Sequence, residues 1–125
     1  MDEFAFKNRT KQVALRIIKL TEALPSTKTA EAIGRQLLPS GTSVGANYRA
    51  ACRGRSPADM SSRLAIVEEE ADESIYWIEL LIEAGIIPAQ RLSGLLDELN
   101  QIVAMIVASQ KTLRHTYPKS RIRNP

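Results

Sequence analysis

Carboxylates that could hold a metal ion are concentrated in one segment of this sequence. Residues 68–83 contain seven acids and no base, and Glu70 and Glu73 form a Glu-x-x-Glu pair. Magnesium prefers octahedral oxygen coordination, so a magnesium-dependent helical nucleotide hydrolase needs a second acidic pair on a later helix. The two later glutamates of the segment, and Glu98, are each followed three residues on by an uncharged residue. We therefore predict no metal site and no cofactor.

Other catalytic constellations are also incomplete. A di-iron site in a helical bundle needs Glu-x-x-His pairs, but the only histidine, His115, is preceded three residues earlier by Thr112. The only cysteine, Cys52, has no base near it in the sequence, and there is no Gly-x-Ser-x-Gly motif or glycine-rich phosphate loop. The sequence predicts a protein without enzymatic activity.

The acidic pair can instead be explained by charge pairing. Gly54 ends one expected helix, and Arg35 precedes it by about as many residues as Glu73 follows it. If the two flanking helices are antiparallel, these side chains face each other. We predict that Arg35, Glu70 and Glu73 form a partly buried ionic network, with a ligand site as the alternative.

Basic residues are the candidates for binding a polyanion. The net charge is +3, and residues 111–125 carry five bases and no acid. Arginines and lysines that neutralise phosphates give sequence-independent affinity for nucleic acids. The candidates around the second and third helices and in the tail are Arg49, Arg53, Arg55, Arg63, Lys119, Arg121 and Arg123.

Four apolar stripes with helical spacing predict the elements that carry these residues. The first stripe gives a helix over 8–24, and the second gives a helix over 28–53. A third helix begins at Pro57, after the serine cap Ser56, and ends before Gly85, while the fourth stripe spans 92–113. No segment shows the alternation of a strand. Short loops make neighbouring helices antiparallel.

The resulting prediction is an all-α, antiparallel, up-down-up-down four-helix bundle. Pro39 lies within the second stripe without breaking its phase, so we expect one kinked helix there. The domain is expected to span residues 1–116, and residues 117–125 to form a basic, flexible tail.

The composition fits a cytoplasmic protein. A chain of 125 residues, 44% hydrophobic and 25% charged, is large enough to bury the core of one domain. A single cysteine favours a reducing compartment, and the acidic start of the chain lacks the features of a secretory signal. No run of about 18 apolar residues is present, so we predict no membrane partner.

Small and polar residues in the second helix predict close contacts. Glycine, serine and asparagine are weak helix formers, and close packing or buried hydrogen bonds can favour them. Gly41 and Gly45, four residues apart, therefore indicate a tight contact between helices, and Ser43 and Asn47 share one helix face.

Three segments resemble a known family. Residues 43–50, 53–56 and 66–81 are similar to the bacterial four helix bundle proteins, which include proteins encoded in intervening sequences of large-subunit ribosomal RNA genes. The resemblance covers residues 8–115. One departure is Pro39, because similar sequences carry a basic residue there, which weakens any nucleic-acid role of that position.

The resemblance also extends to the accessory variability determinant proteins, which are pentameric and bind nucleic acid and a reverse transcriptase. It implies that this chain is a homopentamer, with RNA or DNA, or a protein, as its partner. The candidates that it implies for close contact within or between bundles are Gly41, Ser43, Gly45, Ala46 and Asn47. The leading hypothesis is a non-enzymatic oligomer that binds structured RNA or DNA. The alternative is a protein-interaction or scaffold module without nucleic-acid binding.

Overall fold

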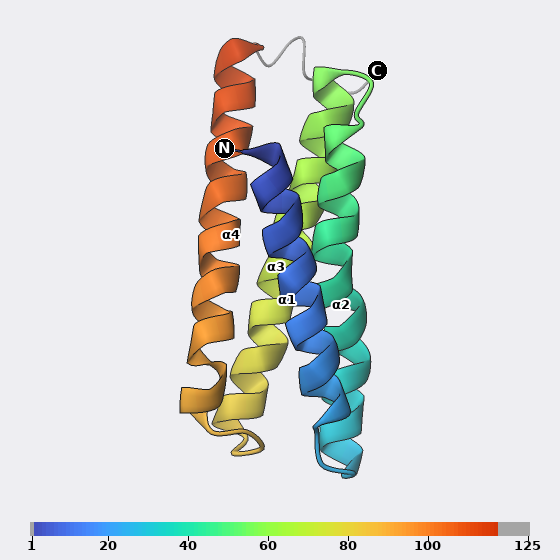
Figure 1. The fold of residues 1–125 in the computed structure, drawn as a ribbon, viewed down its shortest axis with the longest axis vertical. Helices are drawn as coiled ribbons and strands as arrows, with labels where there is room; N and C mark the ends of the chain where they lie inside the picture. Colours follow the sequence, from blue (N-terminus) through green and yellow to red (C-terminus); the bar gives the residue numbers. More distant parts are fainter. Residues whose placement is uncertain (1, 118–125) are drawn as a thin grey trace.

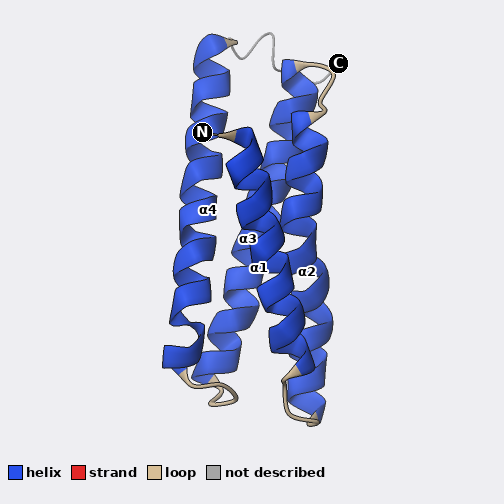
Figure 2. Ribbon diagram, in the orientation of Figure 1, coloured by secondary structure: helices blue, strands red, loops and turns tan. Residues whose placement is uncertain are grey.

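The computed structural model describes residues 2–117 and confirms the all-α bundle. In chain order, its helices are α1 (Glu3–Glu22), α2 (Lys28–Cys52), α3 (Pro57–Glu83) and α4 (Ala89–Thr116). Figure 2 shows that loops join these helices and that this part of the chain has no strand. Of the predicted tail, the description reaches only Tyr117, whose amide donates to the carbonyl of Leu113.

Side-chain caps and one glycine define most of the helix ends. Asp2 accepts from the amides of Phe4 and Ala5, so α1 begins five residues earlier than its apolar stripe predicts. Thr27 caps α2 and Ser56 caps α3 in the same way. Gly85, at a φ of 73°, ends α3 in the left-handed conformation that glycine adopts without strain.

Helix α2 is continuous through Pro39, as expected from the unbroken phase of its apolar stripe. Two hydroxyl groups close to the proline donate to carbonyls one turn earlier in the helix. Ser40 Oγ bonds the Leu37 carbonyl at 3.1 Å, and Thr42 Oγ1 bonds the Leu38 carbonyl at 2.8 Å. The kink at this position stays a prediction.

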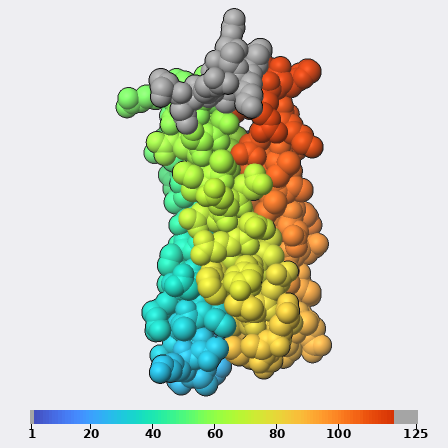
Figure 3. Space-filling model, turned by 180° about the vertical axis from the view of Figure 1, so that it is seen from behind, coloured from blue at the N-terminus to red at the C-terminus, as the bar shows by residue number. Residues whose placement is uncertain are grey.

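The helices run antiparallel to their neighbours around the bundle (Figure 1). Along α2, Gly41 lies against Ile17 and Gly45 lies against Thr10. Residue numbers therefore increase along α2 in the direction in which they decrease along α1. On the other side of α1, Arg9 contacts Glu98. Figure 3 shows α3 between α2 and α4 on the face behind α1.

One hydrophobic core occupies the space between the four helices. Its fully buried side chains include Phe6, Ile17, Leu37, Ile78 and Leu99. The rings of Phe6 and Tyr48 pack edge to face with centroids 4.5 Å apart, which joins the start of α1 to the end of α2.

Helix α4 departs from the expectation about membrane spans. Among the described helices it alone is long and apolar enough to cross a membrane by length and composition. The sequence prediction overlooked this because it looked for an unbroken apolar run, whereas a mean hydropathy of 1.2 tolerates interspersed polar residues. Its buried residues, which include Leu95, Leu99 and Ile102, belong to the bundle core.

Candidate nucleic-acid interface

Three of the predicted arginines surround one hollow at the connection between α2 and α3. The hollow has a volume of about 650 Å³, and Arg53, Arg55 and Arg63 line it. Its other lining residues are Ala50, Ser56, Ala58 and Asp59. Arg53 and Arg55 are exposed, and neither forms an ion pair within residues 2–117. The turn therefore presents two free guanidinium groups beside a third that is paired.

Asp59 reduces the positive charge of this hollow and also organises it. One of its carboxylate oxygens lies 3.3 Å from Arg63 Nε, and the other accepts from the backbone amide of Arg55 at 3.2 Å. Its own amide donates to Ser56 Oγ at 3.0 Å, which is the cap of α3. The carboxylate thus fixes the turn, and the partly exposed Arg63 pair is a weak, screened one.

Arg49 belongs to a different surface, a groove between α1 and α2. The groove has a volume of about 460 Å³, and Lys7 and Lys11 of α1 line it together with Arg49 of α2. The sequence prediction missed both lysines, because only the contact between α1 and α2 brings them beside an arginine. Their spacing of four residues on one helix face was the available signal.

The small residues of α2 separate into two sets. Gly41 and Gly45 are buried, and a Cβ atom on them would lie 2.9 Å from Ile17 Cγ2 and 3.1 Å from Thr10 Oγ1, respectively. These two glycines allow α1 and α2 to approach closely within the bundle. Ala46 is exposed and lines the groove.

The two polar members of the same segment bond to each other. Asn47 Nδ2 donates to the carbonyl of Ser43 at 2.9 Å, within one turn of α2, and both residues are partly buried. This bond is local to the helix. A contact between subunits at these positions stays a prediction.

The predicted ionic network of Arg35, Glu70 and Glu73 is wrong. The ion pairs within residues 2–117 join Lys7 to Glu3, Arg9 to Glu98 and Arg63 to Asp59. The reason is the register of α2 against α3. Ser74 donates to Ser40, so Glu73 lies level with Ser40, more than one helical turn from exposed Arg35.

The two acids of that prediction have other surroundings. Glu73 accepts from Trp77 Nε1 at 3.1 Å. Burial, and then the charges of Glu73 and Glu69, raise the pKa of Glu70. Within residues 2–117 no group of three His, Cys, Asp or Glu side chains is placed to hold a metal ion.

An ion pair between α1 and α4 is one of the polar contacts that sequence reasoning missed. Arg9 Nε and Nη2 donate to the two carboxylate oxygens of Glu98 at 2.9 and 2.7 Å, and Nη2 also donates to Gln101 at 3.1 Å. The hydrogen bond from Arg9 lowers the pKa of Glu98, and the same bond raises that of Arg9. The two residues lie 89 positions apart in the chain, so no local pattern pairs them.

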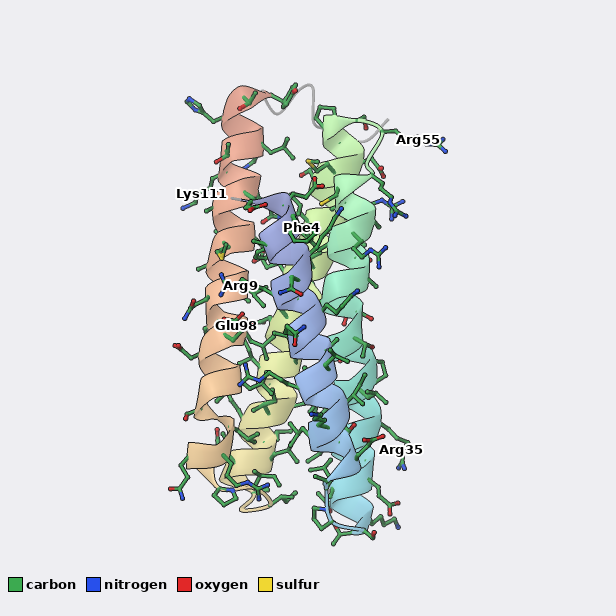
Figure 4. All side chains as sticks on the ribbon, viewed as in Figure 1. Phe4, Arg9, Arg35, Arg55, Glu98 and Lys111 are labelled. Carbon is green, nitrogen blue, oxygen red and sulfur yellow. The ribbon has the colours of Figure 1, made fainter. Side chains whose placement is uncertain are left out.

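The remaining candidates are Lys119, Arg121 and Arg123, which lie outside the described residues. Figure 4 shows Arg35 and Arg55 at opposite ends of the bundle, so the basic hollow occupies one end only.

Comparison with known proteins identifies the family. The family model described as "23S rRNA-intervening sequence protein" matches residues 2–108. A crystal structure of a protein of unknown function from the S23 ribosomal protein family of Bacteroides thetaiotaomicron is similar, with a TM-score of 0.79 and 32% identity. The match covers 84% of this chain and 97% of that one. Comparison with curated proteins gave no match. The resemblance to proteins of ribosomal RNA intervening sequences is therefore confirmed, and this chain belongs to the 23S rRNA-intervening sequence protein family.

Proposed function

We propose that this protein is a non-enzymatic, cytoplasmic homo-oligomer that binds structured RNA or DNA through phosphate contacts. The observation that carries the proposal is the convergence of Arg53, Arg55 and Arg63 on one hollow. Guanidinium groups match phosphate oxygens in charge and in hydrogen-bond geometry. The family description, which refers to ribosomal RNA intervening sequences, favours RNA as the first ligand to test.

The charge of the single chain suits weak, salt-sensitive binding. Its net charge is +3, and Asp59 offsets one arginine in the hollow. An oligomer would bring several copies of the hollow to one ligand, which raises the apparent affinity without new contacts. Each phosphate contact to duplex nucleic acid releases about 0.9 counterion, so the affinity should fall steeply as salt increases.

Alanine substitution at the hollow tests the proposal. We expect Arg53→Ala with Arg55→Ala to weaken binding of a structured ribosomal RNA fragment, measured by fluorescence anisotropy from low to high salt. The slope of log affinity against log salt should become shallower by about 0.9 for each lost contact. The matched control is Arg35→Ala, an exposed arginine at the other end of the bundle. Equal effects of both substitutions, or no binding at low salt, would refute the proposal.

Oligomerisation is supported by the separation of charge over the surface. The acids of residues 68–83 lie on α3, whereas Lys7, Lys11 and Arg49 lie across α1 and α2. Complementary faces on one chain can meet head to tail and close into a ring, and the family resemblance suggests five subunits. Light scattering at micromolar protein should give the mass of a pentamer. A monomer mass would remove this part of the proposal.

A second candidate function is a protein-interaction module. Exposed apolar residues on α3 favour it, because Ile66 and Tyr76 are 38% and 53% accessible in an otherwise acidic helix. A pull-down with and without nuclease separates the two functions. Partners that survive nuclease treatment and depend on Tyr76 would favour the module, and partners lost with the nucleic acid would favour the leading proposal.

A further inference from the structure

The groove between α1 and α2 is hollow where its α2 wall is made of small side chains. From α2, Thr42, Gly45 and Ala46 line the groove together with one long side chain, Arg49. The α1 wall carries Phe4, Lys7, Asn8, Lys11 and Ala14. Apart from Arg49, the groove therefore has a flat wall on α2 and its longer side chains on α1.

The groove is positively charged, and none of the residues within 2–117 that line it is acidic. Its charged members are Lys7, Lys11 and Arg49. Lys7 lies 3.2 Å from Glu3 in an exposed pair one turn earlier on α1, which screening by solvent weakens. Lys11 and Arg49 are exposed and have no ion pair within residues 2–117. The groove thus carries, within residues 2–117, one cation without an ion pair on each of its two helices.

An aromatic ring stands beside these cations. Phe4 is 82% exposed, whereas Phe6 is 1% exposed and packs against Tyr48 in the core. Phe4 is held at the first turn of α1, because its amide donates to the capping carboxylate of Asp2 at 3.0 Å. Figure 4 shows Phe4 at the start of α1. The exposed ring offers a flat apolar face beside these cations, which suits a ligand that combines an aromatic base with negative charge.

We propose that this groove binds single-stranded nucleic acid. An unpaired base stacks on Phe4, while Lys11 and Arg49 contact the phosphates of the same strand. Aromatic rings accept any base in this way, and neighbouring cations follow the backbone, which is the usual mode of single-strand binding. The bases of a duplex are already stacked on one another, so a duplex can use the cations of the groove but not the ring.

This inference rests on the proposed nucleic-acid binding and adds a distinct site to it. None of the residues within 2–117 that line the arginine hollow at the α2–α3 connection is aromatic, so this part of the hollow offers no ring for a base to stack on. The groove adds a preference for unpaired nucleotides. A ribosomal RNA fragment with a helix and an adjacent loop offers a ligand for both sites.

The test compares Phe4→Leu with the wild-type chain on three probes of equal length. The probes are a fluorescein-labelled single-stranded RNA of mixed sequence, the same sequence as DNA, and its RNA duplex. We expect Phe4→Leu to weaken single-strand binding by about tenfold and to leave duplex binding unchanged. Phe4→Trp should retain single-strand binding. Leu15→Ala, at an exposed apolar residue of α1 that is not among the described residues lining the groove, is the matched control and should change neither.

A second measurement separates stacking from charge. A single-stranded probe with 2-aminopurine should lose fluorescence on binding to the wild-type chain and not on binding to Phe4→Leu. The salt dependence of Phe4→Leu should equal that of the wild type, whereas Lys11→Ala with Arg49→Ala should make it shallower by about 0.7 per lost phosphate contact. Because Phe4 is exposed, its variants are expected to fold, and circular dichroism verifies this.

The outcomes distinguish this inference from the function on which it rests. If Phe4→Leu leaves single-strand binding unchanged while the Arg53 and Arg55 variants lose duplex binding, the groove is not a stacking site and the proposed function stands. If Phe4→Leu weakens duplex and single strand equally, or lowers the oligomer mass in light scattering, the groove has another occupant. If no probe binds at low salt, both proposals fail. Binding to RNA alone, or to both RNA and DNA, supports the groove and reports whether the 2′-hydroxyl contributes.

Discussion

Replacing Gly41 with alanine tests the close approach of α1 and α2. A Cβ atom at position 41 would lie 2.9 Å from Ile17 Cγ2, well inside the 3.5–4.0 Å at which carbon atoms attract each other. Ile17 is 0% exposed, so its side chain cannot move into solvent to make room. The helices must separate or Ile17 must leave its preferred rotamer, which costs about 1–3 kcal/mol.

The helix propensity of alanine acts in the opposite direction. Alanine is more favourable than glycine in a helix by about 1 kcal/mol, so the net loss of stability for Gly41→Ala is about 0–2 kcal/mol. A control removes this ambiguity. Gly94 lies on the exposed face of α4, and a Cβ atom there would lie 3.4 Å from the end of the Arg16 side chain, an ordinary contact. Gly94→Ala should therefore stabilise the protein by up to about 1 kcal/mol.

The measurement is urea unfolding followed by circular dichroism at 222 nm. The free energies of unfolding of the two variants should differ by about 1–3 kcal/mol, because the helix propensity cancels in the comparison. In an Ile17→Ala background, which removes the atoms that clash, Gly41→Ala should be as stabilising as Gly94→Ala. If Gly41→Ala stabilises the wild-type chain as much as Gly94→Ala does, the inferred close contact is wrong.

Three other predictions concern buried or paired polar groups. Glu98→Gln should lower stability by about 1 kcal/mol at neutral pH by breaking the pair with Arg9. Folding lowers the pKa of Glu98, so the stabilisation by this pair is present above the unfolded pKa of about 4.3 and is lost as pH falls through the folded pKa. The free energies of unfolding of wild type and variant, measured by urea titration, should therefore converge at acid pH. Ser74→Ala removes the buried bond to Ser40 and should cost about 1 kcal/mol by the same assay; an unchanged midpoint would contradict a stabilising bond. Burial raises the pKa of Tyr48, so its phenol should not contribute to the rise in absorbance at 295 nm that tyrosine ionisation causes below about pH 11. Tyr48→Phe should therefore leave this rise unaltered, and a smaller rise in the variant would show that the Tyr48 phenol ionises earlier.

The helices could be predicted because their signals are local. Ser56 and Pro57 start α3, and Gly85 ends it, each through the conformation of a few neighbouring residues. The start of α1 was predicted late because its cap, Asp2, precedes the apolar stripe that the prediction followed. An apolar period locates the buried face of a helix, whereas the cap decides where the helix begins.

The site was harder to predict because it depends on how helices slide past one another. Counting residues from a turn placed Arg35 opposite Glu73, but the packing of Ser40 against Ser74 sets a different axial register. A period of 3.6 residues says which face of a helix is buried and leaves this offset open. The placement of Arg53 and Arg55 did not depend on this offset, because both adjoin the same short connection and lie together in any register.

The glycines of α2 also make the width of the groove a property of the core. Phe4 and Lys11 lie on the α1 side of the groove and Arg49 lies on the α2 side. The width of the groove therefore depends on the distance between α1 and α2. Gly41, which is not among the described residues that line the groove, allows this close approach from the core through its contact with Ile17. If Gly41→Ala separates the helices, the groove widens although no ligand touches the substituted residue, and affinity and stability change together. The packing inside the bundle therefore sets the width of a groove on its surface.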